Sequence, residues 1–158
     1  MKRLILLGIL GILVGCAHSA ASLRTATARD LDGRAAPLAR PGKVVLLDFW
    51  AAWCEPCKVA LPLYRKLYGE LRARGFEVVA VSEDDGDEAV RAFLAREPLP
   101  FPVLRDPGGA LAESLSVVEL PTSFVLGRDG RVRARHNGFV ASVEPALRRE
   151  LEALLGEQ

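Results

Sequence analysis

Two cysteines, Cys54 and Cys57, are separated by two residues and follow the almost entirely apolar segment 44–50. This order predicts a dithiol at the junction between a buried strand and a helix. A thiol at a helix N-terminus lies near the positive end of the helix dipole and near unpaired backbone N–H groups. Both favour the thiolate, which is the reactive form. The pair is therefore suited to reversible disulfide exchange; the same spacing also forms half of a zinc site, but the chain offers nothing to complete one.

The length and composition indicate one globular domain with a substantial core. The chain has 158 residues, of which 50% are hydrophobic, and this composition excludes a disordered chain. Lys and Arg total 21 and Asp and Glu total 20. Such a balance provides no basic field, so we exclude nucleic acid as a partner.

The first residues have the features of an export signal. A short positive start, residues 1–3, precedes an apolar stretch at residues 4–14 that only glycines interrupt. The stretch is shorter than the roughly 20 apolar residues that span a bilayer, and it fits the core of a secretory signal. The residues before Cys16 resemble the bacterial lipobox, so we expect residues 1–15 to be removed and Cys16 to carry a lipid. The alternative is an ordinary signal peptide that contains a cysteine.

Lipidation would account for the odd number of cysteines. One of the three cysteines would hold the lipid, and the other two would form the redox pair. Residues 16–25 are then expected to be a lipidated tether, and residues 26–158 the folded domain. Export places this domain where disulfides persist, which predicts an extracytoplasmic (periplasmic), membrane-anchored location.

Apolar periodicity predicts alternating strands and helices. Strands are predicted at residues 44–50, 76–81, 101–104, 122–126 and 132–135. Helices are predicted at residues 57–73, 87–96, 110–115 and 143–155. Pro62 should kink the first helix, and Gly75 should end it. Turns are expected at Asp32-Gly33 and at Pro41-Gly42. The order predicts an α/β domain with a mixed sheet covered on both faces.

Several motifs resemble the thioredoxin superfamily: Asp48-Phe49-Trp50-Ala51, Trp53-Cys54-x-Pro56-Cys57-Lys58, Pro62 and Leu120-Pro121-Thr122. The lipobox, the predicted helix 87–96 and the segments from Phe101 to Gly138 are similar to its TlpA/ResA-like branch. The resemblance covers residues 26–155. It implies a thioredoxin fold with an N-terminal extension and a central inserted helix, and the activity of an exported thiol-disulfide oxidoreductase.

The resemblance assigns a role to each residue around the dithiol. Cys54 would be the exposed attacking thiol, and Cys57 the less exposed thiol that resolves the mixed disulfide. Glu55 places a negative charge beside the thiols and should oppose thiolate formation. Pro56 suits the first helical turn. Trp53 is expected to flank the site, together with Lys58.

Further roles fall on residues distant in the sequence. Pro121 matches the family's cis-proline, which faces the dithiol; Leu120 before it would tune substrate choice, and Thr122 follows it. Asp48 matches the buried carboxylate that handles the proton of the second thiol. An acid in an apolar strand is costly, and its pKa should be raised. The alternative is a structural ion pair, for example with Lys58.

The chain departs from ResA-like members at one position on the active-site helix. They carry a glutamate three residues after the second cysteine, where this chain has Ala60. The departure bears on the narrow specificity of that subgroup and leaves the dithiol chemistry untouched.

The resemblance also implies partners. They are the thiols and disulfides of exported proteins, with apocytochrome c as a candidate substrate, and a membrane thiol transporter as electron donor. We expect a monomer that needs no cofactor beyond its own disulfide and no metal.

Other functions stay open at this point. Within the class, the protein could instead be a disulfide-forming oxidant or isomerase. Outside it, a copper chaperone using Cys54, Cys57 and His136, a peroxidase, or a non-catalytic binding scaffold are the alternatives. The absence of a Thr-x-x-Cys pattern disfavours the peroxidase, and the proline between the cysteines disfavours an inert scaffold.

Overall fold

A computed structural model describes residues 22–157, so the predicted signal segment 1–15 and Cys16 lie outside the described residues. The strands are β1 (Thr27–Asp30), β2 (Ala35–Pro37), β3 (Val44–Trp50), β4 (Phe76–Ser82), β5 (Val103–Arg105), β6 (Thr122–Leu126) and β7 (Val132–Asn137). The helices are α1 (Glu55–Leu71), α2 (Asp87–Arg96), α3 (Ala110–Ser114) and α4 (Glu144–Gly156), with 3-10 turns η1 (Arg72–Arg74) and η2 (Ala141–Val143). Within residues 22–157, no helix is long and apolar enough to cross a bilayer.

The seven strands form one mixed sheet in the order β2-β1-β5-β4-β3-β6-β7. β3, β4 and β5 are parallel neighbours, whereas β6 runs antiparallel to β3 and β7 antiparallel to β6. Parallel strands need crossover connections, which α1 and α2 provide. The carboxyl ends of these three strands therefore lie side by side, and the segments that follow the strands meet there.

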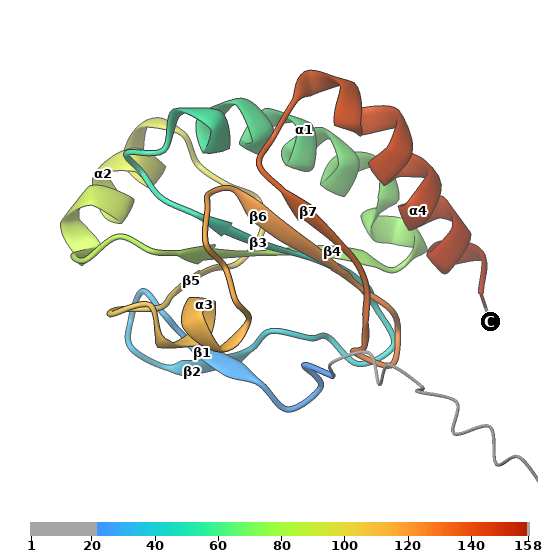
Figure 1. Ribbon diagram of the computed structural model, residues 1–158, viewed down its shortest axis with the longest axis horizontal. Helices are drawn as coiled ribbons and strands as arrows, with labels where there is room; N and C mark the ends of the chain where they lie inside the picture. Colours follow the sequence, from blue (N-terminus) through green and yellow to red (C-terminus); the bar gives the residue numbers. More distant parts are fainter. Residues whose placement is uncertain (1–21, 158) are drawn as a thin grey trace, which may run out of the picture.

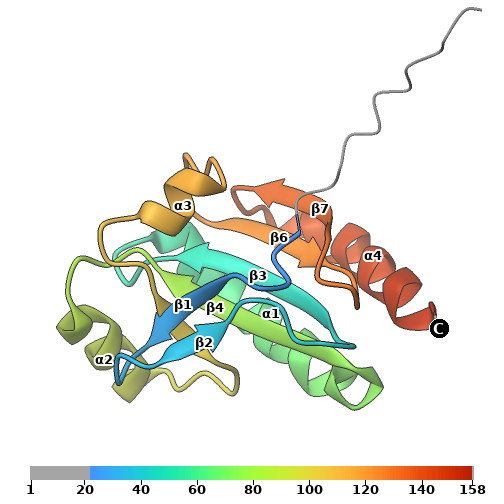
Figure 2. The same cartoon turned by 90° about the horizontal axis from the view of Figure 1, so that it is seen from below.

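β3 is enclosed on both of its faces. All seven of its residues are buried, which explains why its sequence is a nearly continuous apolar run. Trp50 belongs to the cluster shared with α1, α2 and α4, and its ring lies 5.0 Å from that of Phe93. Phe49 points to the opposite face and meets Phe124 at 6.0 Å. Figures 1 and 2 show α1, α2 and α4 over one face of the sheet and α3 over the other.

Local sequence explains where α1 begins. Cys54 has extended backbone angles and is the N-cap, and Pro56 falls in the first turn, where a missing N–H costs little. The helix therefore begins at Glu55, two residues before the predicted start at Cys57. Its end is followed by η1 and by Gly75, whose positive φ of 99° suits glycine.

The N-terminal part of the domain differs from the sequence prediction. Only the turn at Asp32-Gly33 was expected, but the chain on either side of it pairs as β1 and β2. Leu23, assigned to the tether, is 6% exposed and donates its N–H to the carbonyl of Gly130 at 2.9 Å. Leu23 therefore belongs to the folded domain, because its side chain joins the apolar cluster on the α3 face.

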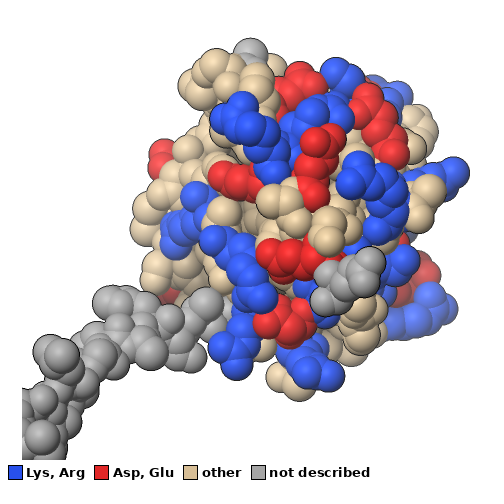
Figure 3. Space-filling view, turned by 90° about the vertical axis from the view of Figure 1, so that its right-hand side faces the viewer, with Lys and Arg blue, Asp and Glu red and all other residues tan. Residues whose placement is uncertain are grey.

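Charged side chains of both signs are interspersed on the face drawn in Figure 3. Two ion pairs join α1 to α4: Lys66 with Glu144 at 2.9 Å, and Arg148 with Glu70 at 2.7 Å. Exposed pairs of this kind each contribute about 0–1 kcal/mol. The burial of apolar side chains between the two helices and the sheet is therefore the main reason that they stay in place.

Truncation of a core side chain on β3 should be costly. Leu46 has no solvent exposure, and Leu46→Ala should lower the free energy of unfolding by about 2–5 kcal/mol because it leaves a cavity. Urea denaturation of the disulfide-bonded protein measures this loss. Val59 on α1 is 60% exposed, so Val59→Ala serves as the control and should change stability by about 0.5 kcal/mol or less. Equal losses in the two variants would contradict this account of the core.

Candidate active site

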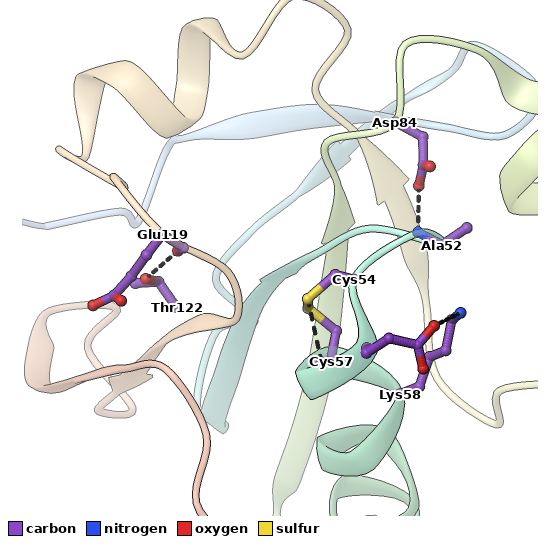
Figure 4. The surroundings of a disulfide bond; sticks show 8 residues. Ala52, Cys54, Cys57, Lys58, Asp84, Glu119 and Thr122 are labelled. Carbon is purple, nitrogen blue, oxygen red and sulfur yellow. Dashed lines mark hydrogen bonds and ion pairs between the residues drawn. A yellow bond between two sulfur atoms is a disulfide. The ribbon is translucent and has the colours of Figure 1, made fainter.

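The two cysteines lie where β3 passes into α1. They form a disulfide, and their Cα atoms are 5.3 Å apart. Cys54 caps the helix: its Sγ accepts a hydrogen bond from the backbone N–H of Cys57 at 3.2 Å (Figure 4). A thiolate at this position would receive the same N–H and the field of the helix N-terminus, which together stabilise negative charge on sulfur.

Both cysteines are covered in the disulfide form. Cys54 is 4% exposed and Cys57 has no exposure. The expected order of exposure is present, but the expectation that Cys54 is exposed is wrong for this state. The reason is that the first turn of α1 packs its inner side on the apolar cluster of the sheet, to which both cysteines belong. Trp53, directly before Cys54, is the neighbour that projects into solvent, with 67% exposure.

A buried carboxylate that follows β4 holds the loop before Cys54. Asp84 accepts a hydrogen bond from the backbone N–H of Ala52 at 2.8 Å (Figure 4) and another from the hydroxyl of Ser82 at 2.9 Å. A run of acidic residues directly after a strand is typical of a solvated turn, but Asp84 is only 3% exposed. The sequence did indicate that Asp84 lies near the dithiol. Asp84 follows β4, which is parallel to β3, so it lies at the same carboxyl end of the strands as Cys54.

Further charged groups surround Asp84. Arg105 at the end of β5 donates to the carbonyl of Asp84 at 3.0 Å and forms an ion pair with Asp87. Asp106 accepts hydrogen bonds from the backbone N–H groups of Leu111 and Ala112 in α3, and its carboxylate is close to that of Glu83. Burial, together with the negative charge of Asp106, raises the pKa of Glu83 to about 7. The carboxyl ends of the parallel strands, beside the dithiol, therefore carry a network of interacting charged groups and not only a solvated turn.

Asp48 is the one acidic residue of β3. It has no solvent exposure, and no donor meets either carboxylate oxygen with hydrogen-bond geometry. Burial raises the pKa of Asp48 well above its ordinary value of 3.8, and the nearby hydroxyl of Tyr64 lowers it by less. The alternative of an ion pair with Lys58 is wrong, since Lys58 pairs with Glu55 at 2.6 Å. Asp48 is therefore a desolvated acid that gains a proton easily.

The segment before β6 forms the other wall of the site. The peptide bond between Leu120 and Pro121 is cis, as the resemblance implies. The hydroxyl of Thr122 donates to the carbonyl of Glu119 at 2.8 Å (Figure 4). A groove of about 570 Å³ runs from this segment to Pro56, which lies between the two cysteines in the chain. It is lined by Pro56, Glu119, Leu120, Arg135, His136, Asn137, Gly138, Phe139, Val140 and Val143.

The structure adds residues that sequence reasoning did not find. Tyr64 from α1 is buried, and two groups of the sheet act on its hydroxyl: Asp48 raises the pKa of Tyr64, and Ser123 of β6 lowers it. Its helical spacing from Cys57 predicted an inward position but no polar role. Ala60, which stands where ResA-like members have glutamate, is fully buried on the same inner side of α1. Asp48 is thus the one carboxylate among the residues that make up β3 and α1 to be fully buried.

The sheet order, the crossover helices and the dithiol at the start of α1 define a thioredoxin fold. A structure from Chlorobium tepidum, assigned provisionally as the thiol:disulfide interchange protein DsbE, has the same architecture. It has a TM-score of 0.79 and 35% identity, with coverage of 87% of this chain and 96% of that one. StoA from Bacillus subtilis matches with a TM-score of 0.65 and 25% identity over 78% of this chain and 92% of StoA.

Within this fold, the chain belongs to the AhpC/TSA family, whose model matches residues 21–135. A curated relative is the thiol-disulfide oxidoreductase ResA of Bacillus thuringiensis subsp. konkukian (strain 97-27), which is 39% identical over 104 residues. That match covers 65% of this chain and 60% of the relative. The resemblance to ResA is therefore confirmed, and the matched part spans about three fifths of that relative.

Replacement of Asp48 should change how stability depends on pH. Because folding raises the pKa of Asp48, the folded protein binds more protons than the unfolded chain, and stability falls as pH rises above 3.8. Asp48→Asn removes the group that binds this proton. The variant should therefore be more stable than the wild type at neutral pH, and its stability should depend less on pH. Urea unfolding of the oxidised protein from about pH 4 to 9 measures it.

The difference between the two curves isolates Asp48, because Glu83 is present in both proteins. Glu55→Gln provides the control, since the side chain of Glu55 is 79% exposed. Its profile should run parallel to that of the wild type. Parallel profiles for Asp48→Asn and the wild type would contradict the assignment of a raised pKa to Asp48.

Proposed function

We propose that this protein is a membrane-anchored, extracytoplasmic thiol-disulfide oxidoreductase that reduces disulfides of exported proteins. The observation that carries the proposal is the dithiol at the N-terminus of α1, beside a groove that reaches the cis bond before Pro121. The 39% identity to a ResA protein supports the same activity. The redox group is the Cys54–Cys57 pair itself, so no further cofactor enters the reaction.

The reaction proceeds in two exchanges. In the reduced protein, the Cys54 thiolate attacks one sulfur of a substrate disulfide; a mixed disulfide forms, and the other substrate sulfur leaves as a thiolate. Cys57 then loses its proton and attacks Sγ of Cys54. The protein disulfide forms and the second substrate thiolate leaves. Two electrons have passed from the dithiol to the substrate.

Two features of the site assist these steps. The Cys57 N–H and the helix N-terminus stabilise the Cys54 thiolate, both as attacking group and as leaving group. Asp48, on the sheet face that α1 covers, takes the proton of Cys57. Its raised pKa makes the carboxylate a better base than an exposed aspartate.

The surface around the dithiol suits a protein substrate. Among the described residues, the exposed large apolar side chains are Trp53, Val59, Val118 and Val140. Trp53 and Val59 lie on either side of the cysteines in the chain, and Val140 lines the groove. Exposed apolar groups that gather at one place mark an interaction surface. An unfolded segment of an exported protein, such as apocytochrome c, has the apolar side chains and free backbone to fill it.

The direction of electron flow depends on the reduction potential. For use as a reductant, the disulfide must be reduced again after each turnover, and a membrane thiol transporter is the donor that we propose. Disulfide formation or isomerisation is the alternative within the same chemistry. A difference of about 30 mV in potential corresponds to about 1.4 kcal/mol, so small changes in thiolate stability decide between these functions.

The potential can be measured by equilibration of the purified protein in thiol redox buffers with alkylation trapping. We expect a reversible couple below about −220 mV, which supports a reductant. A couple between about −180 and −120 mV would instead assign an oxidant or isomerase. Cys54→Ser is the control and should show no couple. If the wild type also shows none, the protein is a binding scaffold and the enzymatic proposal fails.

The anchor is tested separately through Cys16. With lipid on this residue, the protein should be found in the membrane fraction of the cell that exports it, and Cys16→Ser should move it to the soluble extracytoplasmic fraction. A single substitution can do this because membrane affinity scales with the buried methylene groups of the acyl chains. Mass spectrometry of the N-terminal peptide reports the modification directly. Retention of Cys16→Ser in the membrane, or an unmodified Cys16, would contradict the anchor.

A further inference from the structure

A row of polar side chains crosses three neighbouring strands beneath α1 and α4. Asp48 on β3 lies opposite Ser123 on β6, and Ser123 lies opposite His136 on β7. Figure 1 shows these strands side by side, with β7 at the edge of the sheet. Directly opposed residues of antiparallel strands share a face, with Cβ atoms about 4.5–5.5 Å apart. The row thus leads from the interior of the sheet to its edge in two steps.

Exposure to solvent increases along this row. Asp48 is fully buried, Ser123 is 4% exposed, and the side chain of His136 is 20% exposed. His136 also lines the groove of about 570 Å³ that reaches Pro56 and Leu120. The row therefore connects a carboxylate without solvent contact to a groove open to solvent.

Tyr64 bridges the first step of the row from above. It lies on α1 and is 3% exposed. Its hydroxyl interacts with both neighbours in the row: Asp48 raises the pKa of Tyr64, and Ser123 lowers it, while burial raises it most. The ring packs edge-on against Phe139, with the ring centroids 6.3 Å apart.

His136 ends the row with a carboxylate behind it. Its Nε2 lies 2.8 Å from Oε2 of Glu150 on α4, which leaves Nδ1 for the row. Glu119 is another acid that lines this groove. The neighbouring Arg135 donates to the carbonyls of Leu115 and Ser116 and lies over Phe124, on the opposite side of the sheet from Ser123. The ring of His136 therefore has a carboxylate at one nitrogen and the row at the other.

We propose that Tyr64, Ser123 and His136 form the route by which protons pass between Asp48 and solvent. The inference rests on the proposed function, in which Asp48 takes the proton of Cys57. The Tyr64 hydroxyl accepts this proton from Asp48 and donates its own to Ser123. Ser123 donates its proton to Nδ1 of His136, and the imidazolium passes the proton on Nε2 to the carboxylate of Glu150, whose side chain is 38% exposed and releases it to solvent. Each hydroxyl gains one proton and loses one.

The burial of Asp48 is the reason that such a route is needed. Each turnover leaves one proton on a carboxylate that solvent does not reach. During the mixed disulfide, the substrate also covers the face around Cys54, which closes the short path over the dithiol. His136 stands on the edge strand β7 and its side chain is 20% exposed, so the row reaches solvent two strands away from Asp48.

Chemical rescue of His136→Ala tests the route. The purified full-length protein, in its reduced form, is mixed with 5,5′-dithiobis(2-nitrobenzoate) in dilute buffer. The first thionitrobenzoate released reports attack by Cys54, and the second reports resolution by Cys57. At about pH 6, a proton that Asp48 already holds must leave along the row before the carboxylate can take that of Cys57, so His136→Ala should slow the second release about tenfold, and added imidazole should restore it. The first release should be unchanged.

Arg133→Ala is the matched control, since Arg133 lies on the same strand, does not line the groove and pairs with Asp129 at 3.0 Å. Neither the control nor the wild type should respond to imidazole. Ser123→Ala should also slow the second release, whereas Ser123→Thr should retain the rate. Thermal unfolding shows whether each variant is folded.

Two results would overturn the route: a folded His136→Ala with the wild-type rate of second release, or a slow variant that imidazole leaves slow. Both would leave the proposed function standing as long as the wild type releases two thionitrobenzoates. Release of only one by the wild type would instead count against the proposed function, because Cys57 would not resolve the mixed disulfide.

Discussion

The full burial of β3 is the constraint on which the rest of the structure depends. Its seven residues are enclosed by β4 and β6 in the plane of the sheet and by helices on both faces. A strand enclosed in this way has one register, because a shift by one residue would move every side chain to the other face. The position of the dithiol is fixed as a consequence, since Cys54 follows the strand after a short loop and α1 begins at Glu55. Asp48 shares this burial, and its raised pKa has the same origin as the stability of the core.

The site draws on three separate parts of the chain, and each is held by backbone hydrogen bonds or by burial. Asp84 fixes the loop before Cys54, through the N–H of Ala52. The segment before β6 brings Leu120 and the cis bond to the groove. β7 adds His136 at the edge of the sheet. Apart from the dithiol, the site therefore depends on the order of the strands, and a different order would separate its residues.

Sequence reasoning went far for this chain because its local signals agreed with one another. The apolar run at residues 44–50, the Cys-x-Pro-Cys spacing and the Gly75 stop predicted β3, the dithiol and the end of the first helical segment. It failed where an element depends on a distant partner. β1 and β2 are short and half exposed, and they are strands because β5 provides an edge for β1. Leu23 was assigned to the tether because nothing near it in the sequence indicates the apolar cluster that it joins.

The sequence by itself determined the chemistry: two thiols at a helix start, an acid in an apolar strand, and a proline before a late strand. Each of these is a local pattern of residue types, and a local pattern can be recognised without knowledge of the fold. Only the tertiary structure decided which polar groups meet. It buried Asp84 under the loop before the dithiol, paired Lys58 with Glu55 and left Asp48 without an ionic partner. It also aligned Asp48, Ser123 and His136 across three strands. The physical reason is that register between strands distant in the chain is set by packing on the sheet, which no single segment encodes.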